Sequence, residues 1–85
     1  MIKAILLTNN VVIISKIEEV GADIGEPDCK LINPYVINQS SSLLSMEPWL
    51  LNITTQSEFM ISSDKILTIS DPTEELIKKY DSLIK

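Results

Sequence analysis

Few residues of this 85-residue chain could do covalent chemistry. Ser40, Ser41 and Ser42 form a run of hydroxyls, and Cys29 carries the single thiol. A serine becomes nucleophilic through a neighbouring base, and the chain has no histidine and no lysine at a recognisable serine–lysine spacing. Cys29 has only Lys30 beside it, without the helix N-terminus or group of cations that lowers the pKa of a thiol. We therefore expect a non-enzymatic protein in which Cys29 is a small buried residue.

Carboxylates gather in one glycine-containing segment, at Asp23, Glu26 and Asp28. Carboxylate oxygens are the ligands that Ca²⁺ and Mg²⁺ prefer, but the spacing of these three matches no calcium-binding loop. The segment is more typical of a solvated acidic loop. Two glycines cannot form a glycine-rich phosphate loop, and the chain holds no cluster of His and Cys. We predict no metal and no cofactor.

The charge of the chain argues against a strong nucleic-acid binder. Twelve acidic residues outnumber seven basic ones, all of them lysines, and the net charge is −5. Phosphate backbones are bound by clustered Lys and Arg, and the bidentate guanidinium fork is absent here. A single cysteine fits a reducing compartment, so we expect a cytoplasmic location. No stretch approaches the roughly 20 apolar residues of a membrane-spanning helix, and no membrane partner is expected.

The composition predicts a β-rich fold that positions these side chains. Hydrophobic residues make up 45% of the chain, and most of them are Ile, Leu and Val, which favour strands. Strands are predicted at residues 2–7, 11–20, 29–37, 58–61 and 65–69. Asn9-Asn10 lies between the first two runs and predicts a hairpin turn, since Asn tolerates positive φ. Pro34 cannot donate to a ladder, so the third strand should have an edge or a bulge there. Residues 38–42 read as a polar loop, and the strand within residues 43–53 is left without bounds.

A helix is predicted over residues 72–84. Asp71 is a good N-cap, Pro72 would occupy the first helical position, and Glu74 has the spacing of a capping box. One apolar stripe follows at helical spacing, formed by Leu76, Ile77, Tyr80, Leu83 and Ile84.

Two motifs resemble those of the Sm-like family. Asn10, Ile13 and Ser15 follow an apolar strand at the spacing of the family's glycine, apolar residue and second glycine. Residues 59–69 reproduce the apolar frame of its second motif, with Ser62-Ser63 where the family has Arg-Gly. The chain therefore resembles the Sm-like proteins, including the small Sm-like proteins of marine cyanophages. If the chain is encoded by a virus, the expected location is the cytoplasm of the host. The resemblance implies a mainly β, SH3-like open barrel of five or six antiparallel strands with a C-terminal helix, as a single domain over residues 1–85.

The resemblance also implies a homo-oligomeric ring of about five to seven copies, closed by strand pairing between neighbours. The interface residues it implies are Glu58, Phe59, Met60, Ile61, Ile66, Leu67 and Ile69. It places RNA binding at Asn33, Ser62 and Ser63, weakened because serines replace Arg-Gly. Two functions stay open: a ring acting in RNA metabolism, and a protein-binding adaptor of viral origin that does not bind RNA. Trp49 could stack on a base or anchor a subunit contact, or it could be an ordinary residue of the core or of its rim.

Overall fold

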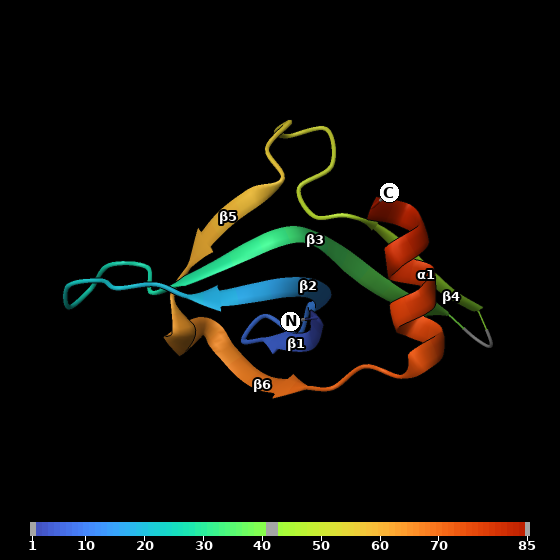
Figure 1. Ribbon diagram of the computed structural model, residues 1–85, viewed down its shortest axis with the longest axis horizontal. Coiled ribbons are helices and arrows are strands. Elements are labelled where there is room, and N and C mark those ends of the chain that lie inside the picture. Colours follow the sequence, from blue (N-terminus) through green and yellow to red (C-terminus); the bar gives the residue numbers. More distant parts are fainter. Residues whose placement is uncertain (1, 41–42, 85) are drawn as a thin grey trace.

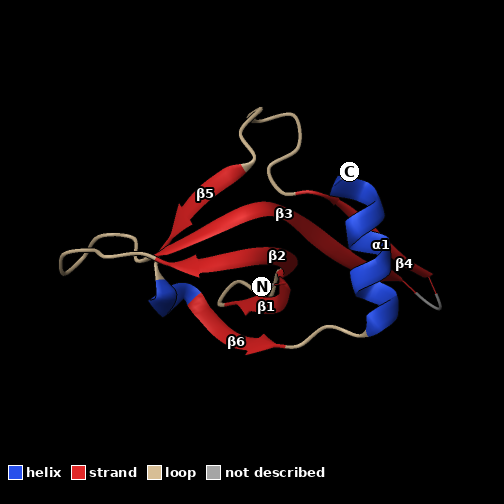
Figure 2. Ribbon diagram, in the orientation of Figure 1, coloured by secondary structure: helices blue, strands red, loops and turns tan. Residues whose placement is uncertain are grey.

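Six strands, one short 3₁₀ turn and one helix follow one another along the chain (Figures 1 and 2). A computed structural model describes residues 2–40 and 43–84. The elements are β1 (Ile2–Leu7), β2 (Val12–Glu19), β3 (Cys29–Ser40), β4 (Leu43–Pro48), β5 (Glu58–Ile61), η1 (Ser63–Lys65), β6 (Ile66–Ser70) and α1 (Glu74–Ile84). Every strand pair is antiparallel, in the order β4-β3-β2-β1-β6, with β5 also on β3. The predicted class, a mainly β open barrel with a C-terminal helix, is confirmed, and the strand number is six.

The predicted hairpin at Asn9-Asn10 joins β1 to β2. Asn10 has a φ of 67°, a left-handed conformation that Asn adopts more readily than most residues. The side-chain oxygen of Asn9 accepts a hydrogen bond from the backbone N–H of Val11 at 3.2 Å. The turn sets the register in which Leu6 lies opposite Val12 and Ile5 opposite Ile13.

The long strand β3 changes partner in the middle. Residues 29–32 pair with β5, and residues 35–40 pair with β4 on the same side of β3. Between these halves the register with β2 shifts by one residue, because Ile14 lies opposite Tyr35 and Lys16 opposite Ile32. The extra residue falls at Asn33-Pro34, where Asn33 has a φ of 53°. Pro34 therefore lies in a bulge of a central strand, which is one of the two positions predicted for it.

The sheet buries apolar side chains on both faces. Directly paired residues share a face, so Ile5 and Ile13 point into the barrel, where they form a fully buried cluster with Leu31 and Leu7. The next residue along, Ile14, points to the opposite face together with its partner Tyr35. Helix α1 covers this second face, and its Tyr80 ring meets Tyr35 edge-on at 5.8 Å between centroids.

Tyr80 attaches α1 to the bulge in β3. Its fully buried hydroxyl donates to the carbonyl oxygens of Asn33 at 2.8 Å and of Ile32 at 3.1 Å. The buried Ser15 hydroxyl lies 2.8 Å from the Lys16 oxygen and 3.1 Å from the Ile32 oxygen, so its one proton is divided between these two acceptors. A bulge interrupts the ladder and leaves carbonyl groups without strand partners, which would be costly inside a core. The Tyr80 hydroxyl supplies a donor to this part of β3, so the bulge helps to set the position of the helix.

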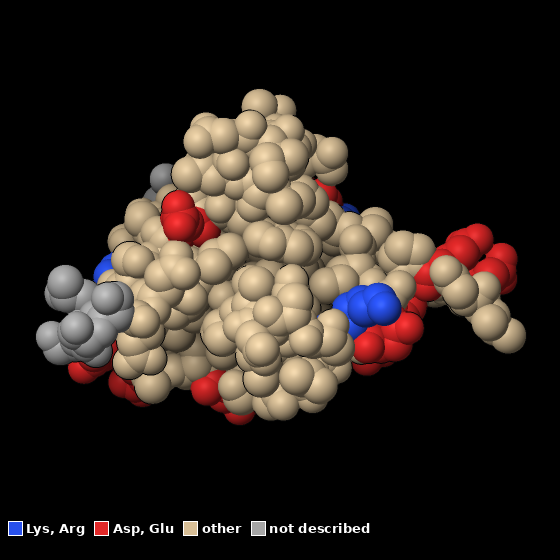
Figure 3. Space-filling model, turned by 180° about the vertical axis from the view of Figure 1, so that it is seen from behind, with Lys and Arg blue, Asp and Glu red and all other residues tan. Residues whose placement is uncertain are grey.

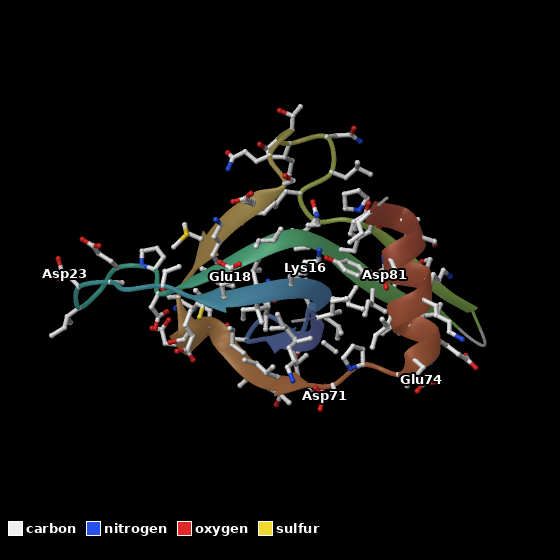
Figure 4. All side chains as sticks on the ribbon, in the orientation of Figure 1. Lys16, Glu18, Asp23, Asp71, Glu74 and Asp81 are labelled. Carbon is white, nitrogen blue, oxygen red and sulfur yellow. The ribbon has the colours of Figure 1, made fainter. Side chains whose placement is uncertain are left out.

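The predicted start of the helix is wrong. Helix α1 begins at Glu74, and Thr73 is its cap: the Thr73 hydroxyl accepts from the backbone N–H of Leu76 at 3.3 Å. Asp71 instead forms an ion pair with Lys3 of β1, and it precedes the helix in Figure 4. Because the Asp71 carboxylate pairs with Lys3, the Thr73 hydroxyl caps the helix in its place.

The predicted polar loop at residues 38–42 is also wrong over its first part. Asn38 and Gln39 belong to β3 and pair with Ser45 and Leu44 of β4, while Ser41 and Ser42 lie outside the described residues. The partner strand β4 supplies ladder bonds that extend β3 past its apolar part, whatever the β-propensity of these residues. The apolar stretch 43–53 is a strand only to Pro48. The predicted strand at 65–69 lies one residue later, at Ile66–Ser70.

Candidate functional site

The seam between β5 and β6 is the place where the barrel stays open. Strand β5 bonds to β3 and strand β6 bonds to β1, and within residues 2–40 and 43–84 neither has a second partner. Ser62 and the η1 turn connect the two strands directly. Each strand therefore presents one row of backbone N–H and C=O groups without ladder partners, the arrangement that invites pairing with another chain.

Side chains that face the barrel interior are exposed at this seam. Ile69 lies opposite the fully buried Ile5 and so points inward, yet 48% of its surface is exposed. Leu67 lies in the register shift between β6 and β1 and is 59% exposed. Across the seam, Phe59 and Ile61 of β5 lie opposite Leu31 and Cys29 and also face inward. One side of the apolar interior is therefore left uncovered.

A cavity of about 540 Å³ lies beside β6, one of the two strands of this seam. Its lining is mostly apolar and comes from Ile17, Cys29 and the four successive residues of β6 that begin at Ile66, together with the polar side chains of Lys3, Glu19 and Ser63. Cys29 is buried, as predicted. Burial raises the pKa of its thiol, with a further contribution from the charge of Asp28, so the group is a thiol at neutral pH. The mostly apolar lining of the cavity suits aliphatic side chains.

Strand β4 lies at the other end of the sheet, and its outer edge is protected against pairing with another strand. The Lys79 ammonium of α1 donates to the carbonyl oxygen of Leu44 at 2.8 Å, and Pro48 ends the strand. Lysine and proline are the residues with which natural proteins block sheet edges. The edge of β4 is therefore blocked, whereas the edges of β5 and β6 are open.

Ser62 and Ser63, predicted as RNA-binding residues, lie beside an acidic group. The backbone N–H and the hydroxyl of Ser63 donate to the two carboxylate oxygens of Asp28, each at 2.7 Å. These hydrogen bonds lower the pKa of Asp28, so it stays negatively charged. A small cavity of about 190 Å³ at this place is lined by Asp28, Glu26 and Asp64 among its residues. A phosphate there would meet carboxylates of its own sign.

Asn33, the third predicted RNA-binding residue, is not part of that group. Its backbone N–H donates to the Ser57 oxygen at 2.6 Å, just before β5 begins, whereas Ser62 follows the end of β5. At 3.3 Å per strand residue, the five steps from Ser57 to Ser62 span roughly 16 Å. The structure therefore separates the predicted residues and gives Asn33 a part in the bulge.

Trp49 is a core residue with one edge in contact with β5. It packs partly buried against the interior cluster, and its ring meets Phe59 at 5.4 Å and 64°. Of the predicted roles, the core role is the one that these contacts bear out. Asp23 lies far out on the loop between β2 and β3 and points away from the body (Figure 4). In the described part of the chain, no three His, Cys, Asp or Glu side chains converge as a metal site would require.

Comparison with known proteins gives a family for the whole chain. A family model described as a family of unknown function, DUF6561, matches residues 1–85. The chain belongs to the DUF6561 family. No curated protein matches it significantly. None of the helices in the described part of this DUF6561 chain has the length and apolarity to cross a membrane.

Two features of this DUF6561 protein were missed by sequence reasoning. The contact between Asp28 and Ser63 joins residues 35 positions apart, and neither residue stands in a pattern that would pair them. The inward orientation of Ile69 depends on its register with Ile5, which the order of residues within β6 does not reveal. The apolar content of β5 and β6 was the signal available in the sequence for these strands.

Proposed function

We propose that this DUF6561 protein is a non-enzymatic assembly module of Sm-like type. Copies would join the β5 edge of one to the β6 edge of the next, closing a ring of about five to seven copies in the cytoplasm. The observation that carries the proposal is the half-exposure, at the open seam, of the inward-facing Ile69 and of Leu67 in the register shift beside it. A neighbouring strand β5, with its inward-facing Phe59 and Ile61, would continue the sheet and cover these side chains.

Closure into a ring rather than a filament follows from how the two edges are linked. Only Ser62 and the η1 turn separate β5 from β6, so the angle between the two edges is fixed within each copy. The contact is head-to-tail, and such a contact closes into a ring when its constant rotation divides a full turn without a translation along the axis, as we propose here. Protection of the third edge by Lys79 removes a competing mode of pairing at β4.

Weak RNA binding is part of the proposal. The net charge of −5 repels a phosphate backbone. The backbone N–H and the hydroxyl of Ser63 already donate to the Asp28 carboxylate and are therefore not free for a phosphate. Titration with oligo-U and oligo-A at physiological salt should give no complex tighter than about 1 μM. A tighter complex that weakens steeply with salt would establish the RNA function instead.

Light scattering tests the ring. Wild-type protein should have a mass of several protomers, and the double variant Leu67→Asp/Ile69→Asp should lose it, because two carboxylates would be buried in an apolar contact. Both side chains are about half exposed in a single copy, so folding should survive the change. Ile24→Asp is the matched control, since Ile24 is fully exposed on the loop between β2 and β3.

A monomeric wild-type protein would end the ring proposal. The open edges would then favour the adaptor function, in which a partner protein adds a strand at the seam. Unchanged mass in the double variant, with circular dichroism like that of the wild type, would show that copies meet elsewhere.

A further inference from the structure

The cavity beside β6 is a mouth of the barrel interior. Ile17 of β2 lies opposite the fully buried Leu31, so its side chain points inward. Glu19 stands two residues later on the same strand, points to the same side and lies opposite Cys29. Ile17, Cys29 and Glu19 all line the cavity, and of these Glu19 is exposed to solvent. The cavity therefore reaches from the core to a carboxylate at the surface.

The walls of the cavity are mainly aliphatic. Ile66 lies opposite Leu7 and Ile69 opposite Ile5, so both of these side chains of β6 point inward. Ile69 is nevertheless half exposed. An alkyl chain against these side chains would leave water and cover apolar surface, which is a main source of affinity for apolar ligands. The volume of about 540 Å³ lies within the range of cavities that hold small molecules, roughly 300–1,000 Å³.

Two side chains of opposite charge line the cavity, Lys3 and Glu19. The Lys3 ammonium forms an ion pair with Asp71, whereas Glu19 forms no ion pair with any residue that the structure describes. Lys3 lies opposite Ser15 of β2. At 3.3 Å per strand residue, the four steps from Ser15 to Glu19 span roughly 13 Å, which is longer than the screening length of about 8 Å at physiological salt. The Glu19 charge is therefore left without a cation.

The electrostatic potential at the cavity is negative. Burial raises the pKa of the Cys29 thiol, and the negative charges of Asp28 and Glu19 raise it further, because both disfavour a thiolate. Strand β2 ends at Glu19 and leads into the loop that carries Asp23. Figure 3 shows that the end of the molecule with this loop, at the right of the view, carries more acidic than basic surface. The net charge of −5 also attracts cations over a longer range.

We infer that this cavity binds a small aliphatic amine, with the alkyl chain between the inward faces of β2 and β6 and the ammonium group at the Glu19 carboxylate. The ammonium group donates to the carboxylate in a charge-assisted hydrogen bond. A carboxylate or phosphate on the same alkyl chain would meet a charge of its own sign there. All the residues of the site belong to one chain, so the inference goes beyond the proposed ring and does not depend on it.

The thiol of Cys29 reports whether the cavity is occupied, because it lines the cavity. Octylamine should slow the reaction of Cys29 with a thiol reagent, and the effect should saturate as the amine concentration rises. Octanoate has an alkyl chain of similar length, and half-saturation should need at least about fivefold more of it. No protection by octylamine, or equal protection by octanoate, would overturn the inference.

A pair of variants places the ammonium group. Glu19→Gln should raise the half-saturating concentration of octylamine about two- to fivefold, which is the effect of one exposed ion pair. Glu18→Gln is the matched control, because it removes the same charge from the adjacent residue, whose side chain points to the opposite face and lies opposite Lys30. Glu18→Gln should leave the half-saturating concentration nearly unchanged. Equal effects of the two substitutions would show that net charge alone attracts the amine, and the site would be wrong.

Light scattering of the same samples keeps the cavity and the ring apart. A monomeric wild type in which octylamine protects Cys29 would end the ring proposal and support the amine site. A ring in which octylamine gives no protection would do the reverse. The ammonium group on an aliphatic chain also occurs in lysine, so N-acetyl-lysine amide is a further probe. Protection by it at lower concentration than by octylamine would overturn the small amine in favour of a lysine side chain of a partner protein.

Discussion

Replacing Tyr80 by Phe should loosen the attachment of α1 while leaving the core full. The ring stays, so the edge contact with Tyr35 is kept, and only the hydroxyl that bridges Asn33 and Ile32 is removed. Burial raises the pKa of Tyr80, so the hydroxyl is a protonated donor at neutral pH. Its loss leaves buried carbonyl groups short of a donor, which costs about 1–3 kcal/mol. The Tyr80 hydroxyl has one proton and its nearer acceptor is the Asn33 carbonyl, so we expect the loss of about one hydrogen bond, about 1–2 kcal/mol.

Urea denaturation at a fixed protomer concentration measures this loss, because association would otherwise add to the apparent stability. In a chain of this length, about 1–2 kcal/mol corresponds to a fall in Tm of roughly 5–15 °C. Tyr35→Phe is the matched control: its hydroxyl is exposed and lies 3.4 Å from the Leu83 oxygen, so the change should stay within about 0.5 kcal/mol. Equal losses from the two variants would refute the role given to the bulge in holding the helix.

Three further predictions concern the helix cap, the acidic turn and the thiol. Thr73→Ala should cost about 0.5–2 kcal/mol by removing the cap of α1, whereas Asp71→Ala should cost less than about 1 kcal/mol because it removes one ion pair with Lys3; a larger loss for Asp71 in urea melts would contradict the assignment. The folded-state pKa of Asp28 lies below its ordinary 3.8, so the stability it contributes is fully present above that pH and is lost as the pH falls through the lowered pKa. The stability difference between wild type and Asp28→Asn should therefore be constant near neutral pH and shrink below pH 3.8; a constant difference in acid melts down to the lowest pH would contradict it. Cys29 should react with a thiol reagent at least about tenfold more slowly in the native protein than in urea, and equal rates would show that it is not buried.

Local signals in the sequence were enough for the elements that depend on neighbours in the chain. The Asn9-Asn10 turn, the bounds of β5 and the bulge at Pro34 follow from the conformations that asparagine permits, from apolar runs and from the missing N–H of proline. The features that were wrong depend on distant partners. Asp71 was drawn from the helix cap by Lys3, which lies 68 positions away, and Asn38 was drawn into a strand by β4.

The candidate site also combines features that one strand determines by itself with features that depend on distant residues. The apolar character of β5 and β6 could be predicted from the sequence, because this property is carried by each strand alone. Which of these side chains face inward depends on the register of β6 against β1. The environment of Ser63 depends on Asp28, which the fold brings to it from a loop 35 positions earlier. Residue types along the chain cannot specify such contacts without the topology.

The pairing of β1 with β6 has a consequence for how the protein is made. Strand β1 is synthesised before its partner β6, and the Lys3–Asp71 ion pair spans nearly the same interval. Ile5 and Leu7 gain their β6 neighbours only after roughly 60 further residues have been made, and α1 follows to cover the second face. During synthesis the apolar side chains of β1 and β2 therefore stay exposed until β6 has been made. Folding that depends on contacts between residues far apart in the sequence is slow. The nascent chain, rather than the finished domain, is the form most in need of a chaperone.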